Sequence, residues 1–327
     1  MKAAFIREPG LAEAIVYCEL PDPVPEPDQV LVRTRAVAVN PIDTYIRGGA
    51  AFWELAFPYV VGSDVAGEVI GVGSAVTDFK LGDRVWGSNQ GFFGRQGTFS
   101  EMCCIASRWL YPLPEAIPFE DGAAGALVGL TAHLGLFRES KLQPGELVFV
   151  QGGSGGVGSA VVQMAKAAGA TVITTAGSQL KAAACQALGA DHVICYQTQD
   201  VREAIDEFAP DGVDVAWETQ RDADMDLLVH SLAQRGRLIV MAGRDARPEF
   251  PVGPFYVKEA RMIGFVMFKA PPEIQREAAD SINEMLVQGT YKPRIDRVMP
   301  LSEAAAAHRL QEASTVGRSG KLVLVPE

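Results

Sequence analysis

Residues 146–158 read ELVFVQGGSGGVG, in which an apolar, β-favouring run leads directly into a cluster of glycines. A small-residue helical pattern follows at residues 159–168, and Gly169-Ala170 ends it. A second β-favouring run, TVITT, occupies residues 171–175. Strand, glycine turn, helix and strand in this order predict a parallel βαβ unit.

The glycine cluster fits the pattern GxGxxG at Gly153, Gly155 and Gly158. One glycine permits the tight turn, one lets a pyrophosphate approach the backbone, and one allows close packing of helix on strand. Free N–H groups at the positive end of the following helix attract phosphate. We therefore expect this loop, including Gly156 and Val157, to bind a dinucleotide.

The same loop matches a second motif. Residues 152–156 also fit GxSxG, the nucleophile elbow of serine hydrolases, which likewise lies between a strand and a helix. An elbow needs an acid and a histidine downstream, and Asp191, Asp214, His192, His230 and His308 are the candidates. The elbow has no need of Gly158, whereas the dinucleotide motif requires it. A glycine-rich turn that binds nothing is the third interpretation.

The end of the second predicted strand indicates which dinucleotide binds. In an NAD-binding unit an acidic residue about 20 positions after the glycines holds the ribose 2′-hydroxyl. Residues 174–181 read TTAGSQLK and contain no carboxylate. The hydroxyl of Ser178 and the ammonium of Lys181 suit a 2′-phosphate instead. The sequence therefore predicts NADPH, although Lys181 taken alone could be a solvated helix residue.

Composition and charge narrow the class of protein. A chain of 327 residues with 48% hydrophobic and 21% charged residues is typical of two globular domains. The net charge of −11 argues against partners such as nucleic acid or an anionic membrane surface. The start, MKAAFIRE, indicates a charged strand rather than a signal peptide, and no apolar stretch could span a bilayer. We expect a cytoplasmic protein.

The cysteines and histidines show no pattern of metal ligands. The five cysteines form no CxxC pair, and their odd number suits reduced thiols. The four histidines have no ligand spacing either.

Further along the chain, strands and helices alternate. Residues 1–115 are β-rich, residues 123–139 are helical, and later segments repeat the βα pattern. Predicted strands lie at residues 192–195, 213–217, 237–241 and 262–268, with helices at 201–208 and 225–232 between them. This alternation predicts an α/β fold with a doubly wound parallel sheet. A helix at 271–288, another at 302–311 and a strand at 321–325 complete the chain, and we expect this tail to return to the first domain.

Four segments together carry a family resemblance: VNPIDTYIRGG at 39–49, GSDVAG at 62–67, FKLGDRV at 79–85 and the glycine loop. They resemble the medium-chain dehydrogenase/reductase superfamily, and within it the zinc-independent quinone oxidoreductases of the zeta-crystallin type. The resemblance implies a β-rich GroES-like catalytic domain formed by residues 1–123 and 270–327. It also implies a Rossmann NADPH-binding domain at residues 124–269.

The resemblance further implies that no metal is bound. Asn40, Ser63 and Asp64 stand where zinc-dependent alcohol dehydrogenases have a cysteine and a His-Glu pair, and Leu127 stands near the third ligand. A catalytic zinc needs three ligands from cysteine, histidine or carboxylate side chains. We therefore expect activity without zinc.

Site residues are also assigned by resemblance. Asn40 would lie beside the nicotinamide, and Tyr45 would line the acceptor pocket and orient or protonate a quinone oxygen. Asn40 could equally be a turn residue before Pro41, and Tyr45 a core aromatic. Asp43 is interpreted as a structural hydrogen-bond acceptor. The other implied cofactor contacts are Thr131 at the nicotinamide, Tyr196 near the 2′-phosphate, Gly243, and Lys321 near the pyrophosphate, where an exposed strand charge is the alternative.

The predicted function is hydride or electron transfer from NADPH to a quinone. One alternative is an NADPH-dependent reductase of activated C=C bonds in enones, enals or enoyl thioesters. Another is a non-catalytic NADPH-binding protein, structural or RNA-associated, which the acidic charge disfavours.

Assembly is predicted from residues 262–268, an apolar run expected at the edge of the sheet. An open apolar edge invites pairing with another chain. By resemblance it would pair with its own copy, giving a homodimer or a tetramer. The alternative is that the helix at 271–288 covers this edge and leaves a monomer.

Overall fold

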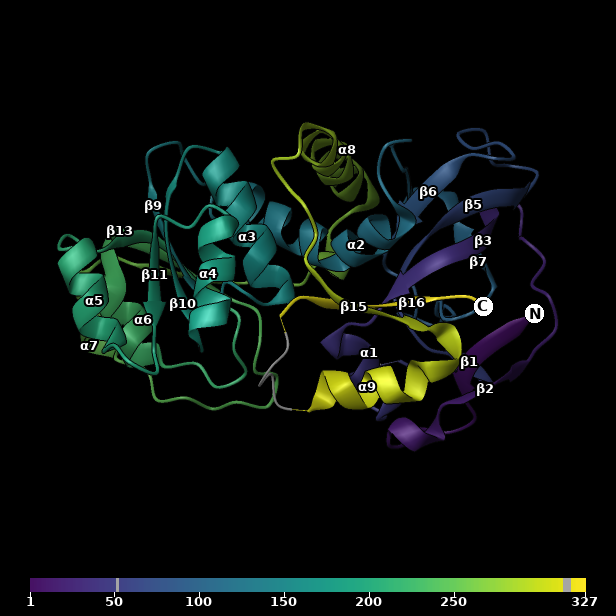
Figure 1. Ribbon diagram of the computed structural model, residues 1–327, viewed down its shortest axis with the longest axis horizontal. Helices are drawn as coiled ribbons and strands as arrows, with labels where there is room; N and C mark the ends of the chain where they lie inside the picture. Colours follow the sequence, from purple (N-terminus) through teal and green to yellow (C-terminus); the bar gives the residue numbers. More distant parts are fainter. Residues whose placement is uncertain (51–52, 314–318) are drawn as a thin grey trace. The chain divides into compact units, whose positions relative to one another are not determined.

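The structure, a computed structural model, describes residues 1–50, 53–313 and 319–327 (Figure 1). The chain divides into two compact units. Unit 1 comprises Met1–Leu127, Pro271–Val287 and Pro293–Glu327, and unit 2 comprises Val128–Ala270 and Gln288–Lys292. The predicted fold class, a doubly wound parallel sheet with a separate β-rich domain, is confirmed.

Unit 2 is built on a six-stranded parallel sheet with the strand order β11-β10-β9-β12-β13-β14. The chain enters at β9, moves outward through β10 and β11, then crosses to β12 on the other side. Ligands of open α/β sheets bind at such a reversal, beyond the carboxyl ends of the strands. The strands are β9 (Leu147–Gln151), β10 (Thr171–Ala176), β11 (His192–Cys195), β12 (Val213–Glu218), β13 (Leu232–Val240) and β14 (Arg261–Gly264).

Helices cover both faces of this sheet (Figure 1). α3 (Gly156–Ala167) and α4 (Gln179–Ala187) contact β9, β10 and β11, while α5 (Val201–Phe208) and α6 (Met225–Ser231) contact β11, β12 and β13. Phe149, Ile173 and Ala216 of the sheet pack with Ile205 and Leu228 of the helices in one buried cluster. The short α7 (Val252–Val257) precedes β14, and a π-helical segment (Leu134–Glu139) precedes β9.

The predicted strand at 262–268 is too long. β14 ends at Gly264, and Met267–Lys269 form a 3-10 turn. β14 hydrogen-bonds to β13 only as far as the pair Val240↔Gly264, and β13 itself ends at Val240. Because the ladder has no partner strand beyond that pair, the chain turns away.

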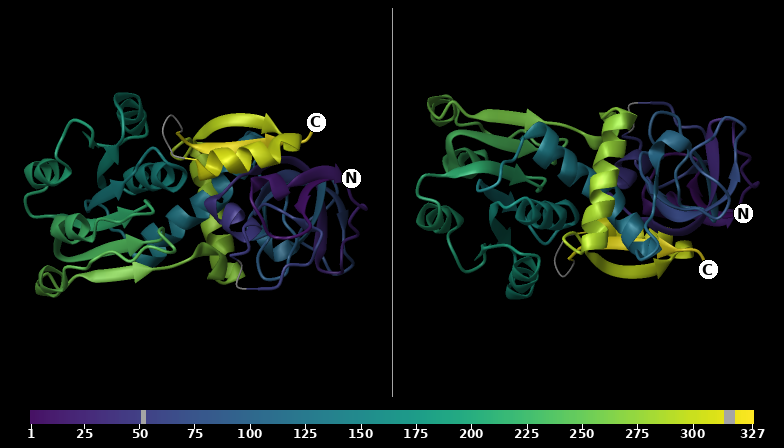
Figure 2. Two further views of the ribbon diagram at one scale, coloured as in Figure 1. Left: turned by 90° about the horizontal axis from the view of Figure 1, so that it is seen from below. Right: turned by 90° about the horizontal axis from the view of Figure 1, so that it is seen from above.

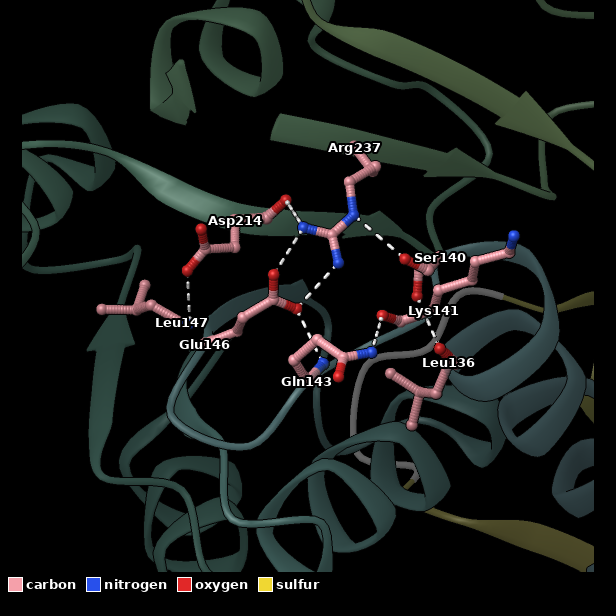
Figure 3. A network of polar contacts seen from close by, with 8 residues as sticks. All are labelled: Leu136, Ser140, Lys141, Gln143, Glu146, Leu147, Asp214 and Arg237. Carbon is pink, nitrogen blue, oxygen red and sulfur yellow. Dashed lines mark hydrogen bonds and ion pairs between the residues drawn. The ribbon is translucent and has the colours of Figure 1, made fainter. Parts of the chain in front are cut away.

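Arg237 of β13 ties together the segments around the start of β9 (Figure 3). Its guanidinium donates two hydrogen bonds to the Glu146 carboxylate, at 2.9 and 2.7 Å. It also donates to the carbonyl oxygens of Ser140 (3.0 Å) and Asp214 (3.2 Å). The Asp214 carboxylate in turn accepts the N–H of Leu147 at 2.8 Å. This network fixes the edge of the sheet opposite the carboxyl ends of its strands.

Unit 1 contains two sheets. A three-stranded sheet has the order β2-β1-β4, and a seven-stranded sheet has the order β15-β16-β3-β5-β6-β8 with β7 paired to β3. The first comprises β1 (Lys2–Ile6), β2 (Val16–Glu19) and β4 (Tyr59–Val60). The second comprises β3 (Gln29–Ala38), β5 (Asp64–Val72), β6 (Arg84–Gly87), β7 (Met102–Ala106), β8 (Leu110–Pro112), β15 (Ile295–Pro300) and β16 (Lys321–Val325).

The C-terminal strand brings distant sequence into unit 1. β16 pairs with β3 through Val323↔Ala38 and Leu324↔Val37. α9 (Ala304–Glu312) lies beside β16 and contacts α1 (Pro41–Arg47) (Figure 2). The other α-helices of the described residues are α2 (Phe119–His133) and α8 (Pro272–Gln288). Among the described residues, no helix combines the length and the apolar character needed to cross a membrane.

Candidate functional site

The glycine loop of unit 2 leaves no space for side chains at two of its three motif positions. A Cβ on Gly153 would lie 2.2 Å from Oγ1 of Thr174, and a Cβ on Gly158 would lie 2.2 Å from the carbonyl oxygen of Gly152. Gly155 is the N-cap of α3, and the helix begins at Gly156. The loop therefore brings bare backbone to the N-terminus of a helix, as phosphate binding requires.

Threonines that the sequence analysis did not single out hold this loop. Thr175 accepts the N–H of Gly152 on its hydroxyl (2.9 Å) and that of Gly153 on its carbonyl oxygen (3.3 Å). The hydroxyl of Thr174 donates to the carbonyl oxygen of Val150 at 2.7 Å. The sequence did contain one indication of this role, the pair Thr174-Thr175 at the end of the predicted strand that follows the glycine loop and its helix.

The residues predicted to hold the 2′-phosphate come together around Gly177. Ser178 is the N-cap of α4, and its hydroxyl accepts the main-chain N–H of Lys181 at 3.3 Å. A Cβ on Gly177 would lie 2.1 Å from the hydroxyl oxygen of Tyr196, so the tyrosine lies against the glycine backbone. Tyr196 is 51% exposed. The segment after β10 thus brings Ser178 and the first turn of α4, which contains Lys181, close to Tyr196, the residue after β11.

Loops after β12 and β13 approach each other at Gly243. Its φ is +73°, and a Cβ there would lie 2.2 Å from the carbonyl oxygen of Arg221. A pocket of about 600 Å³ lies at the carboxyl ends of β13 and β14. Its lining comes from the ends of those strands and the turn that follows (Val240, Met241, Ala242, Gly264, Phe265, Val266, Lys269, Ala270) and from the π-helical segment (Leu134, Arg138, Glu139).

Glu218 is a buried acid that the sequence analysis missed. It ends β12 beside Gln151 of β9, is 1% exposed, and accepts the N–H of Gln220 on Oε1. Within the described part of the chain, Oε2 of Glu218 and Oε1 of Gln151 have no hydrogen-bond partner. Burial raises the pKa of Glu218 to about 7. The sequence feature that could have identified Glu218 is its place directly after the predicted strand at 213–217.

Asn40 lies in unit 1, within a buried polar cluster. It is the N-cap of α1, and its main-chain N–H donates to the Asp43 carboxylate at 2.8 Å in a capping box. The interpretation of Asp43 as a structural acceptor is therefore confirmed. Nδ2 of Asn40 donates to Asp64 Oδ2 (2.7 Å) and lies 3.2 Å from Ser63 Oγ. Asn40, Ser63 and Asp64 are fully buried.

Lys321 belongs to the same cluster. Its Nζ donates to the carbonyl oxygen of Val39 (2.7 Å) and to Oδ1 of Asn40, and lies 3.9 Å from Asp64 Oδ2. The side chain is only 6% exposed, so the interpretation as an exposed strand charge is wrong. Burial raises the pKa of Asp43 to about 7 and also raises that of Asp64, which the nearby Lys321 ammonium opposes.

Two predicted site residues lie outside this cluster. Tyr45 is half-buried on α1, in unit 1. Thr131 is buried on α2, in the part of that helix that belongs to unit 2.

Two known family profiles match the chain. Residues 26–115 match the alcohol dehydrogenase GroES-like domain, and residues 156–284 match the zinc-binding dehydrogenase family. The quinone oxidoreductase of Rattus norvegicus is 35% identical, covering 99% of this chain and 98% of the relative. That of Pseudomonas aeruginosa is 33% identical, covering 97% of each.

The name of the second profile implies zinc, and the residues of unit 1 do not fit it. The cluster around Asn40 contains an ammonium, which would repel a divalent cation. Nδ2 of Asn40 is a hydrogen-bond donor to Asp64. Among the described residues, no group of three or more histidine, cysteine or acidic side chains could hold a metal ion. A tetrahedral zinc site needs such a group.

Solved structures agree with the sequence matches. An Escherichia coli quinone oxidoreductase complexed with NADPH has a TM-score of 0.88 and 28% identity over 100% of both chains. An NAD-dependent alcohol dehydrogenase has a TM-score of 0.92 and 29% identity, also over 100% of both. Likeness over the full length supports the dinucleotide interpretation of the glycine loop. The chain belongs to the medium-chain dehydrogenase/reductase family, among the zeta-crystallin-like quinone oxidoreductases.

Proposed function

We propose that this protein transfers a hydride from NADPH to a quinone without a metal ion. The observation that carries the choice of cofactor is the edge formed by Ser178, Lys181 and Tyr196 around Gly177. The segment 174–181 contains no carboxylate to repel a 2′-phosphate. The NADPH bound in a structural neighbour and the names of the relatives support the same assignment.

In this proposal unit 2 binds the cofactor. The N–H groups at the start of α3 bind the pyrophosphate, and the Lys181 ammonium and the Ser178 hydroxyl bind the 2′-phosphate. Thr131 and Gly243 belong to the nicotinamide end. The nicotinamide supplies the hydride when the cofactor is bound.

Unit 1 contributes the acceptor side. The phenol of Tyr45 orients the quinone and donates a hydrogen bond to the oxygen that becomes negatively charged as the hydride is added. Asn40 was predicted beside the nicotinamide. Its carboxamide is hydrogen-bonded at both ends inside unit 1, so we propose that it acts by holding the start of the helix that carries Tyr45.

An acceptor panel tests this function. Purified protein is assayed for oxidation of NADPH and of NADH, with quinones on one side and enones, enals and enoyl thioesters on the other. We expect turnover of quinones with NADPH. Turnover of the C=C substrates alone would make the protein an enone-type reductase. Tight NADPH binding without turnover of any acceptor would make it a non-catalytic binding protein.

We further propose a homodimer formed through the free edge of β14. Met262 of β14 and Val266, two residues beyond its end, are 43% and 42% exposed, and β14 pairs with β13 on its other side. Light scattering should give twice the chain mass at micromolar concentration, and Met262→Lys should give the monomer mass, because a charge at an edge opposes pairing. A monomer mass for the unmodified protein would contradict the dimer.

A further inference from the structure

The buried cluster of unit 1 contains more charge than a core normally tolerates. Asp43, Asp64 and Lys321 are 2%, 0% and 6% exposed, and they come from α1, β5 and β16. Burying a charge is costly unless it is paired and hydrogen-bonded. The Lys321 ammonium therefore offsets part of the cost of burying the two carboxylates.

The contacts of Lys321 also determine the orientation of Asn40. An amide has one end that only accepts hydrogen bonds and one that only donates them. Oδ1 of Asn40 accepts from Lys321, while Nδ2 donates to Asp64 at 2.7 Å. A rotated amide would put its N–H groups against the ammonium and its oxygen against the carboxylate. The cation thus selects a single orientation.

The contacts that orient Asn40 also involve the start of α1. The main-chain N–H of Asn40 donates to the Asp43 carboxylate at 2.8 Å, and Nδ2 of Asn40 lies 3.2 Å from Ser63 Oγ. Ser88 donates to the other oxygen of Asp64 at 2.7 Å. Segments from both ends of the sequence meet at one carboxamide at the start of α1.

We propose that Lys321 is a tethered internal cation, which balances Asp64 and orients Asn40 as a metal ion would orient its ligands. Lys321 is then a positioning residue of unit 1 and makes no contact with the cofactor pyrophosphate. This assignment differs from the role that family resemblance implies for Lys321. It also predicts that the cluster does not bind zinc, because Lys321 already supplies the positive charge there.

A double-mutant cycle on stability tests the charge pairing and does not depend on the proposed function. Lys321→Met leaves Asp64 without its cation, and Asp64→Asn leaves Lys321 without its nearest carboxylate. Each should lower the midpoint of thermal unfolding by about 10 °C. The double variant should lose much less than the sum, because both charges are then gone. Lys80→Met, at an exposed site of unit 1, is the control and should change nothing. A double variant that loses the full sum would overturn the pairing.

NADPH titration distinguishes the two roles of Lys321. If Lys321 is an internal cation, the double variant should bind NADPH within about twofold of the unmodified protein. A lost phosphate contact would instead weaken binding about tenfold or more. The double variant is used because it is expected to fold even if Lys321→Met alone does not. Weakening of tenfold or more would overturn the internal-cation role.

Turnover tests the positioning role, and this arm alone rests on the proposed function. The double variant should recover stability but not kcat, because Oδ1 of Asn40 still lacks its donor. We expect kcat to fall about tenfold while the KM for NADPH stays unchanged. This factor corresponds to the loss of about one hydrogen bond to a charged group. Full kcat in the stable double variant would show that Lys321 is structural only. Absence of quinone turnover in the unmodified protein would instead refute the proposed function and leave the stability result standing.

Discussion

The glycine loop of unit 2 is built from backbone, whereas the polar cluster of unit 1 is built from side chains. In the loop, Gly153 and Gly158 exclude side chains and present N–H groups at the start of α3. In the cluster, Asn40 and Lys321 are hydrogen-bonded to each other across 281 positions of sequence. A backbone site leaves a local signature of glycines, while a cluster assembled by the sheet leaves none. The first can therefore be recognised from its own residues, whereas Asn40, Ser63 and Asp64 of the second could be grouped only through the family resemblance.

The buried charges of the two units also differ in how they are paired. Arg237 forms a bidentate pair with Glu146, and both side chains keep some exposure, 15% and 21%. Lys321 has lost almost all contact with water, and its nearest carboxylate lies 3.9 Å away. The Arg237 pair balances charge locally. The unit 1 cluster instead depends on every member, and it should respond more strongly when one is removed.

Substitution of the loop glycines should have the largest effect, and it tests whether the loop of unit 2 depends on bare backbone. Gly158→Ala places a Cβ 2.2 Å from the Gly152 carbonyl oxygen, so the loop must distort. A Cβ on Gly155 meets that oxygen at 3.5 Å, an ordinary contact, so Gly155→Ala should fold normally. We expect NADPH affinity to fall more than about a hundredfold, roughly 3 kcal/mol, in Gly158→Ala, and about tenfold in Gly155→Ala.

Fluorescence titration with NADPH measures both affinities, and thermal unfolding reports the fold. Gly253→Ala is the control, because nothing lies within 4 Å of a Cβ there. Unchanged binding in Gly155→Ala and Gly158→Ala would mean that the loop does not hold the phosphates.

The next effect concerns Glu218, the acid of unit 2 that most resembles those of unit 1. Burial raises its pKa from 4.5 to about 7, so the folded protein keeps a proton that the unfolded chain releases. The contribution of Glu218 to the free energy of unfolding is therefore fully present below pH about 4.5 and is lost as the pH rises to about 7. The loss is at most about 3 kcal/mol, at 1.36 kcal/mol per pKa unit.

Glu218→Gln cannot ionise and should therefore be more stable than the unmodified protein at pH 8, with little difference at pH 5. Urea unfolding at the two pH values measures this. Glu207→Gln, at an exposed position of α5, should follow the unmodified protein. If the stability of Glu218→Gln depends on pH in the same way as that of the unmodified protein, groups other than Glu218 cause the pH dependence.

The smallest effect is on the exposed edge of the cofactor site. Lys181→Ala keeps the cap of α4, because Ser178 accepts the main-chain N–H of residue 181. We expect NADPH to bind more weakly by about 1.5–3 kcal/mol, the scale of a hydrogen bond to a charged group, and NADH to be unaffected. Parallel titrations with the two cofactors measure the difference, with the exposed Arg202→Ala as control. If Lys181→Ala binds NADPH and NADH equally more weakly, Lys181 does not contact the 2′-phosphate.

The sequence predicted what local pattern determines. The helix at 201–208 and the strand at 321–325 have the predicted bounds, because period and flanking residues specify them. The strand at 262–268 was predicted too long, since its end depends on where β13 stops. In the same way, composition could not reveal the burial of Lys321 or Glu218, because their surroundings come from strands distant in sequence.

Turnover after removal of metal ions tests the central claim, hydride transfer from NADPH to a quinone without a metal, most directly. The protein is treated exhaustively with a chelator, checked by elemental analysis, and assayed for quinone reduction with NADPH. We predict an unchanged kcat and no response to added zinc, because an ammonium already lies beside Asn40 and Asp64. Loss of activity that zinc alone restores would contradict the account.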